Sequence, residues 1–194
     1  MPVIQRIRYL AFKWEALALL VFGRKAAAAA VFDRMLAEFP RDAYAMASKA
    51  HLLVQSGDRG QALQLLQALV QDEPGSAHHW FNYGFMLEEA GEYPQAEAAF
   101  RRATEISPSL DRAWYGLGLV LIQLQRFDEA VAALKQNTKL QPMSPYGWYQ
   151  LARVHVDRHE PDEARKIIRH LKKFEPKVAA QLERETGIFV SNPS

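Results

Sequence analysis

Residues 77–108 read AHHWFNYGFMLEEAGEYPQAEAAFRRATEISP, and this stretch sets the pattern of the whole chain. Trp80 and Leu87 are seven residues apart, so they fall on one face of a predicted helix. Gly91 favours a tight turn after that helix. Pro108 cannot continue a helix and therefore ends a second one. The stretch predicts two short helices joined by a turn.

The same pattern recurs along the chain with a period of 34 residues. Five prolines are evenly spaced by this interval, and aromatic, alanine and bulky apolar positions keep the same register. The four columns are Pro40, Pro74, Pro108, Pro142 and Pro176; Phe12, Met46, Trp80, Trp114 and Trp148; Ala28, Ala62, Ala96, Ala130 and Ala164; and Phe32, Leu66, Phe100, Leu134 and Ile168. Five copies in one phase indicate a repeat architecture.

The spacing resembles the tetratricopeptide repeat, W-x2-L-G-x2-Y…A-x3-F…P, with Tyr83 in the Leu slot and Leu87 in the Tyr slot. This resemblance implies an all-α fold, a right-handed α-solenoid of about five helix–turn–helix repeats with a C-terminal capping helix. We expect a single solenoid domain over residues 1–194. The expected repeats are 9–42, 43–76, 77–110, 111–144 and 145–178, and the capping helix spans about 177–187.

Several helix boundaries can also be predicted. Asp42, Ser76 and Ser144 stand where N-cap residues of three first helices are expected. Residues 177–186 predict a last helix with one apolar and one polar side, which is typical of a terminal cap. Gly187 ends it, and residues 191–194 are expected to form a loose tail.

The first predicted helix is apolar nearly all round, whereas a terminal repeat normally presents a polar outer face. Its apolar residues are Leu10, Phe12, Trp14, Leu17, Leu19, Leu20, Val21 and Phe22. We expect Trp14, Leu17 or Leu20 to be covered by residues 2–8 folding back, by a second copy of the chain, by a partner, or by a membrane surface. The run 16–22 resembles a short secretory signal, but its charged flanks and its register favour a repeat helix.

In the family that the sequence resembles, the first helices of the repeats line a concave groove. The stripe opposite their packing side should therefore face a partner. The candidate partner-binding residues, called the groove stripe below, are Tyr44, His51, His78, Phe81, Asn82, Phe85, Arg112, Tyr115, Leu119, Tyr146, Tyr149 and Arg153. Such a lining suits an amphipathic helix or an extended apolar peptide. The alternative is that the aromatic residues only pack between neighbouring repeats.

Some members of this family hold the acidic C-terminal tail of heat-shock chaperones in a clamp of Lys, Asn and Arg side chains. Asn82 and Arg112 match two positions of that clamp, but Ala47, His51 and Gly116 depart from the other three. Without those donors a terminal carboxylate would be poorly held. We therefore do not expect this activity here.

Composition and motifs argue against several other classes of protein. The absence of cysteine excludes disulfides and thiolate metal sites, and a net charge of +2 does not indicate nucleic acid. The basic residues of 165–173 are interpreted as a solvated face. His155 and His159 have the spacing of two metal ligands, but no third ligand is evident. We expect no enzyme, no cofactor and no metal.

The sequence thus predicts a cytoplasmic, non-catalytic scaffold or adaptor that binds another protein, as a peptide or a helix, in its groove. The alternative is an assembly factor that self-associates or docks on a membrane complex through its apolar first repeat, in which case its localisation would be membrane-associated. A homo-oligomer is therefore kept open. Nucleic acid is not an expected partner, and peripheral contact with a membrane is the less favoured interpretation.

Overall fold

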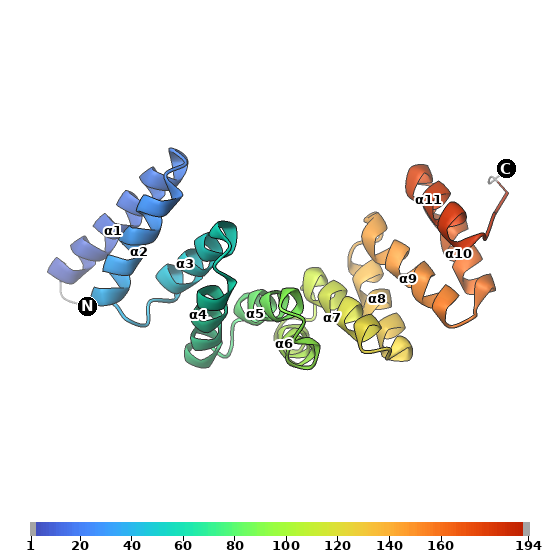
Figure 1. Cartoon of the computed structure of the whole chain (residues 1–194), viewed down its shortest axis with the longest axis horizontal. Coiled ribbons are helices and arrows are strands. Elements are labelled where there is room, and N and C mark those ends of the chain that lie inside the picture. Colours follow the sequence, from blue (N-terminus) through green and yellow to red (C-terminus); the bar gives the residue numbers. More distant parts are fainter. Residues whose placement is uncertain (1–2, 192–194) are drawn as a thin grey trace. The chain divides into compact units, whose positions relative to one another are not determined.

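The computed structural model describes residues 3–191, and these residues form helices and connecting turns without any strand (Figure 1). The helices of this described range are α1 Val3–Val21, α2 Lys25–Glu38, α3 Ala43–Ser56, α4 Arg59–Asp72, α5 Ala77–Glu89, α6 Tyr93–Ile106, α7 Asp111–Gln123, α8 Phe127–Leu140, α9 Pro145–Asp157, α10 Pro161–Leu171 and α11 Pro176–Thr186. The predicted all-α repeat fold with a C-terminal helix is confirmed.

The chain forms two compact units, residues 1–86 and 87–194, and each is described by itself. In the first unit α1 packs on α2, and α3 packs on both α2 and α4. In the second unit α7 packs on α6 and α8, α9 packs on α8 and α10, and α11 packs on α9 and α10. Whether the whole chain acts as one domain with the expected repeat boundaries stays a prediction.

The start of α1 corrects one expectation. Residues 3–8 do not fold back over the first repeat, because they continue α1 as a regular helix from Val3. This segment holds neither proline nor glycine, so nothing in it interrupts the helix. It therefore lengthens the apolar surface of α1 instead of covering it.

The repeated alanine and bulky apolar columns form the core of the hairpins. Ala28, Ala62, Ala96, Ala130 and Ala164 are all fully buried. The neighbouring column of Phe32, Leu66, Phe100, Leu134 and Ile168 is also buried. The small residue lets the paired helices approach, and the large residue one helical turn later fills the space between them.

The tryptophan and proline columns are joined by a hydrogen bond that repeats with the sequence. The indole Nε1 of Trp80 donates to the carbonyl oxygen of Pro74 at 2.9 Å. Trp114 with Pro108 and Trp148 with Pro142 repeat this bond at the same distance. Each tryptophan thus fixes the loop that precedes its own helix.

The turn inside each hairpin needs a residue in the left-handed region of backbone conformation. Gly23, Gly57 and Gly91 supply it in three repeats, with φ between 71° and 88°. The same column holds Gln125 and His159, each with φ of 58°. A residue with a Cβ pays a steric cost in this conformation that glycine does not.

Replacing Gln125 or His159 with glycine is therefore expected to stabilise the second unit. Relief of the left-handed strain outweighs the extra backbone entropy of glycine in the unfolded chain, and a net gain of about 0.5–1 kcal/mol per site is expected. Thermal unfolding of each single variant measures this gain. The control is Gln123→Gly at the last residue of α7, two residues before Gln125, which should destabilise because the backbone there is still helical.

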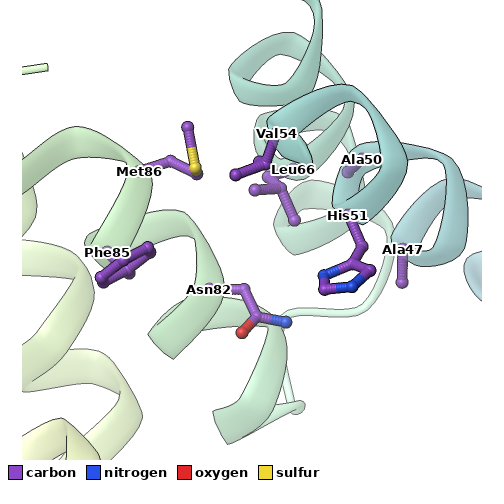
Figure 2. A pocket seen from close by; sticks show the side chains of 8 residues that line it. All are labelled: Ala47, Ala50, His51, Val54, Leu66, Asn82, Phe85 and Met86. Atoms are coloured by element: carbon purple, nitrogen blue, oxygen red, sulfur yellow. The ribbon is translucent and has the colours of Figure 1, made fainter. Parts of the chain in front are cut away.

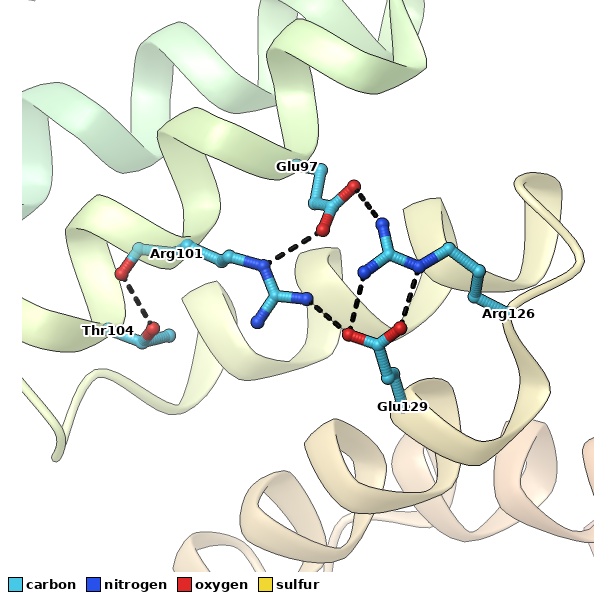
Figure 3. Close-up of polar contacts among 5 residues, drawn as sticks. All are labelled: Glu97, Arg101, Thr104, Arg126 and Glu129. Atoms are coloured by element: carbon cyan, nitrogen blue, oxygen red, sulfur yellow. Dashed lines mark hydrogen bonds and ion pairs between the residues drawn. The ribbon is translucent and has the colours of Figure 1, made fainter.

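A network of four charges links α6 to α8 on the surface (Figure 3). Arg126 holds both oxygens of Glu129 at 2.7 Å and reaches Glu97 at 2.6 Å. Arg101 contacts the same two carboxylates at 2.8 and 2.6 Å. The hydrogen bond from Arg126 lowers the pKa of Glu129. Arg126 pairs with Glu129 through two hydrogen bonds and the Glu97 side chain is only 13% exposed, so the network has the geometry in which ion pairs contribute to stability.

The predicted N-caps differ in outcome. The Asp42 carboxylate accepts a hydrogen bond from the Ala45 amide at 2.8 Å, and the Ser76 hydroxyl accepts one from the His79 amide at 3.4 Å. Ser144 occupies the N-cap position of α9, but its side chain makes no cap bond. The predicted N-cap position is therefore confirmed at Ser144, where Pro145 in the first helical turn presets the backbone for the helix.

The C-terminal segment is tied down beyond α11. Gly187 ends α11 in the left-handed conformation, and Val190 is buried against the last hydrophobic core. The Val190 amide donates to Glu183 at 2.8 Å, and Lys172 donates to the Val190 carbonyl oxygen. Of the expected loose tail, residues 192–194 lie outside the described range.

Candidate functional site

The first unit has an open hollow of about 110 Å3 between α3 and α5, with one residue from α4 (Figure 2). Its lining residues are Ala47, Ala50, His51, Val54, Leu66, Asn82, Phe85 and Met86. Three of them, His51, Asn82 and Phe85, belong to the groove stripe. Stripe residues from two successive repeats therefore meet at one site.

The hollow has an apolar floor and a partly polar rim. Ala50, Leu66 and Met86 are buried, whereas His51 and Asn82 are exposed and point towards one another in Figure 2. A nitrogen of His51 lies 2.6 Å from the Gln55 amide nitrogen, so His51 accepts from Gln55 through that atom. An apolar floor with a few polar groups at its rim is the usual lining of a ligand pocket.

A second hollow in the same unit lies beside α1, where Tyr44 meets Leu10, Lys13, Trp14 and Leu17. Tyr44 packs edge-on against Phe32 at 5.9 Å between ring centroids. The ammonium of Lys13 sits 4.2 Å from the centroid of the Tyr44 ring. The Tyr44 ring therefore already packs against residues of its own unit.

The groove-stripe residues of the second unit are also partly committed to packing. Tyr115 and Tyr149 are half-buried against the last hydrophobic core. The Tyr149 hydroxyl donates to Glu185 of α11 at 2.5 Å, and the Arg153 guanidinium lies 5.8 Å from the Tyr149 ring centroid. The sequence did not reveal Glu185 as a neighbour of the stripe, since α11 is outside the repeat pattern.

The remaining predicted residues vary in exposure. Tyr146 is 70% exposed, His78 and Arg112 are exposed, and Phe81 and Leu119 are half-buried. Leu20, expected with Trp14 and Leu17 on an outer surface, instead packs against the first hydrophobic core. Trp14 and Leu17 remain exposed.

Glu88 is a half-buried carboxyl group near the end of α5, next to Glu89. Burial, with the nearby charge of Glu89, raises the pKa of Glu88 to about 7. Glu88 lies close enough to Tyr115 that its charge adds to the effect of burial in raising the pKa of that phenol. The carboxyl group is thus poised to change charge near neutral pH.

We expect stability to fall as the pH rises through 7 because of Glu88. The pKa of the Glu88 carboxyl group is higher in the folded chain than in the unfolded chain. Its contribution to the free energy of unfolding is therefore complete below about pH 4.5, and it is lost as the pH rises to about 7 and the group ionises in the folded state. Glu88→Gln should therefore flatten this dependence and raise the free energy of unfolding by about 1–2 kcal/mol at about pH 8, after allowance for partial solvation. Urea unfolding between about pH 4.5 and about pH 8 measures the free energy of unfolding of the unmodified protein and of the variant. Exposed Glu105→Gln serves as the control, and an unchanged slope in Glu88→Gln would contradict the assignment.

Gly116 explains why a carboxylate clamp does not fit here. A Cβ added at this position would lie 2.6 Å from the ring of Phe100, which is fully buried. A donor side chain at residue 116 would therefore displace a core residue. The departure from the clamp pattern has a structural cause.

Two other predicted groups have local partners. Buried His155 lies 2.7 Å from the Glu160 carboxylate through Nδ1. Along the basic segment 165–173, Arg165 pairs with Asp162 and Lys166 pairs with Glu163, while Lys172 forms an ion pair with Glu183. Among residues 3–191, no group of three or more His, Asp or Glu is placed to hold a metal ion.

The paired helices with a repeated Trp–Pro bond and a repeated left-handed turn define a helical repeat protein. Two family models described as tetratricopeptide repeat match residues 48–111 and 87–149, which together span more than half of the chain. The chain therefore belongs to the tetratricopeptide repeat family. Comparison with curated proteins gave no match.

Several solved structures share the fold. A MamA protein superposes with a TM-score of 0.80 at 16% identity, covering 94% of this chain and 97% of that one. Residues 41 to the end of MamA from Desulfovibrio magneticus RS-1 give 0.77 at 17% identity, with 91% and 96% covered. YrrB, described as a TPR protein with an unusual peptide-binding site, gives 0.77 at 16% identity, with 87% and 88% covered. Identities this low establish a common fold alone.

Across residues 3–191, none of the helices combines the length and the apolar character that a membrane span requires.

Proposed function

We propose that this chain is a non-catalytic adaptor that binds a peptide or helix of another protein along the groove stripe. The hollow between α3 and α5 carries the proposal, because it joins an apolar floor to a polar rim at residues predicted from two successive repeats. YrrB, which shares the fold, is described as having a peptide-binding site, and this supports the same class of ligand.

Binding would place one apolar side chain of the partner on the floor formed by Leu66 and Met86. The exposed amide of Asn82 can donate to and accept from the partner's backbone. Phe85, which is 43% exposed, would cover the apolar side chain from the side. Aromatic residues of this kind often dominate the energy of an interface.

For the test, peptides that bind the unmodified protein are first selected from a random display library. We expect Phe85→Ala to weaken their affinity about tenfold or more, and Asn82→Ala to weaken it less, in fluorescence anisotropy titrations. Gln67→Ala, an exposed change on α4 that does not line the hollow, should leave affinity unchanged. Equal binding by all three variants would refute the proposal.

The residues of this test are chosen because they are exposed. Changing Tyr115 and Tyr149 together to alanine also probes the stripe, but both rings pack on the last core. Loss of binding in that double variant would therefore count only if its thermal unfolding matched that of the unmodified protein.

A further inference from the structure

Glu88 departs from the repeat pattern at a position that is apolar in every other copy. In the 34-residue register its column holds Leu20, Val54, Ile122 and Val156. All five residues lie on first helices and are half-buried. Leu20, Val54 and Ile122 pack against the hydrophobic cores of their units. The third repeat therefore places a carboxyl group where the other four repeats place a hydrocarbon side chain.

The Glu88 carboxyl group has no cation to compensate its charge. Among residues 3–191 it takes part in neither a hydrogen bond nor an ion pair. Glu97, Glu160 and Glu183 are also partly or fully buried in the second unit, and each of them pairs with an arginine or a lysine. A half-buried carboxylate without a partner costs stability. A charge kept at such a cost, against the local pattern, is a candidate for binding.

The neighbours of Glu88 in the second unit are aromatic and uncharged. The charge of Glu88, on α5, acts on the phenol of Tyr115 on α7. The Tyr115 hydroxyl also interacts with Gln150, by a hydrogen bond, and with the phenol of Tyr146, both on α9. We call these four residues the Glu88 cluster. The cluster combines a carboxylate with two phenol oxygens and two aromatic rings, and Tyr146 is 70% exposed.

The two arginines of the groove stripe in this unit do not neutralise the cluster. The Arg153 guanidinium lies over the Tyr149 ring, and its charge acts on Glu185. Arg112 is not among the groups that shift the pKa of Glu88, which are burial and then the charge of Glu89, and both of these raise it. The compensating positive charge therefore has to come from a bound partner.

We infer that the Glu88 cluster binds a lysine or arginine side chain of the partner. This inference rests on the proposed function and assigns a residue type to the bound peptide or helix. A cation at this surface gains charge-assisted hydrogen bonds to the carboxylate and a cation–π contact with an exposed tyrosine ring. An apolar side chain would leave the carboxylate uncompensated, and an acidic side chain would be repelled.

Parallel peptide selections give the first arm of the test. One random display library is selected on the unmodified protein and on Glu88→Gln at about pH 8, where the Glu88 carboxyl group, with a pKa of about 7, is ionised. Peptides retained by the unmodified protein should carry lysine or arginine at one position about threefold more often than those retained by Glu88→Gln. Glu105→Gln, the same change at an exposed carboxyl group on α6, should keep the enrichment.

Titrations with single peptides give the second arm. Replacing the enriched lysine with norleucine keeps most of the aliphatic stem and removes the charge. This replacement should weaken binding to the unmodified protein about tenfold and binding to Glu88→Gln less than about twofold. Since Glu88→Gln is expected to be more stable than the unmodified protein at this pH, unfolding cannot account for its weaker binding.

Two results would overturn the inference. Equal lysine and arginine contents in the two selections, whether or not tight binders emerge, would show that Glu88 does not choose the partner. An equal loss from norleucine on both proteins would show that the cation binds elsewhere. Peptides that depend on Phe85 but show neither effect would leave the proposed function standing without this inference. Peptides that depend on Glu88 but not on Phe85 would support the cluster and count against the hollow between α3 and α5.

Discussion

Phe100→Ala is expected to lower the free energy of unfolding of the second unit by about 4 kcal/mol, because it empties a fully buried site in the repeated core. Phe100 belongs to the large apolar column, and its ring lies against the backbone of Gly116 in α7. Chemical denaturation followed by circular dichroism measures the loss. Phe85→Ala, the same change at a 43% exposed phenylalanine, should cost less than about 1 kcal/mol.

Gly116→Ala tests the same contact from the other side. Alone it should cost about 1–3 kcal/mol, since its methyl group would lie 2.6 Å from the Phe100 ring. In a Phe100→Ala background the added methyl group has room, so its cost should largely disappear. Strictly additive losses would show that the ring and the glycine are not packed against one another.

Much of this core could be predicted from the sequence, because each position of the repeat lies in the same environment in every copy. Ala28, Ala96 and Ala164 share one fully buried setting, so their identity in successive copies already indicates close packing. The left-handed turn was likewise visible at Gly91. The 34-residue register also places His159 in the column of Gly91, at the same turn. The positive φ of His159 and Gln125 was not predicted, because neither residue type requires that conformation.

Contacts with residues outside the repeat pattern were harder to predict from the sequence. Nothing in the periodicity indicates that Glu185 would bond to Tyr149, since α11 occurs once. The floor of the α3–α5 hollow includes Leu66 of a second helix, whereas the predicted stripe drew on first helices alone. Leu20 was assigned to an outer surface on hydrophobicity, and only the helix rotation in the structure turns it towards the core.

Lys172→Met is expected to destabilise the C-terminal end of the second unit by about 2–3 kcal/mol. The Lys172 ammonium lies 2.8 Å from Glu183, and the two side chains are only 13% and 11% exposed. Removing the cation leaves a carboxylate with little access to water, which costs more than the pair itself contributes. Differential scanning calorimetry on the intact chain measures the loss.

A paired replacement separates the cost of the unpaired charge from the worth of the ion pair. Lys172→Met with Glu183→Leu should recover most of the stability, since no charge is then left buried. Burial raises the pKa of Glu183, but hydrogen bonds from Lys172 and the Val190 amide outweigh it and leave that pKa below its usual value. The contribution of the pair is therefore present above the unfolded pKa and is lost as the pH falls, so the unmodified protein should converge in stability with the double variant in acid. A double variant as unstable as Lys172→Met would show instead that the aliphatic stem of the lysine is what holds the segment.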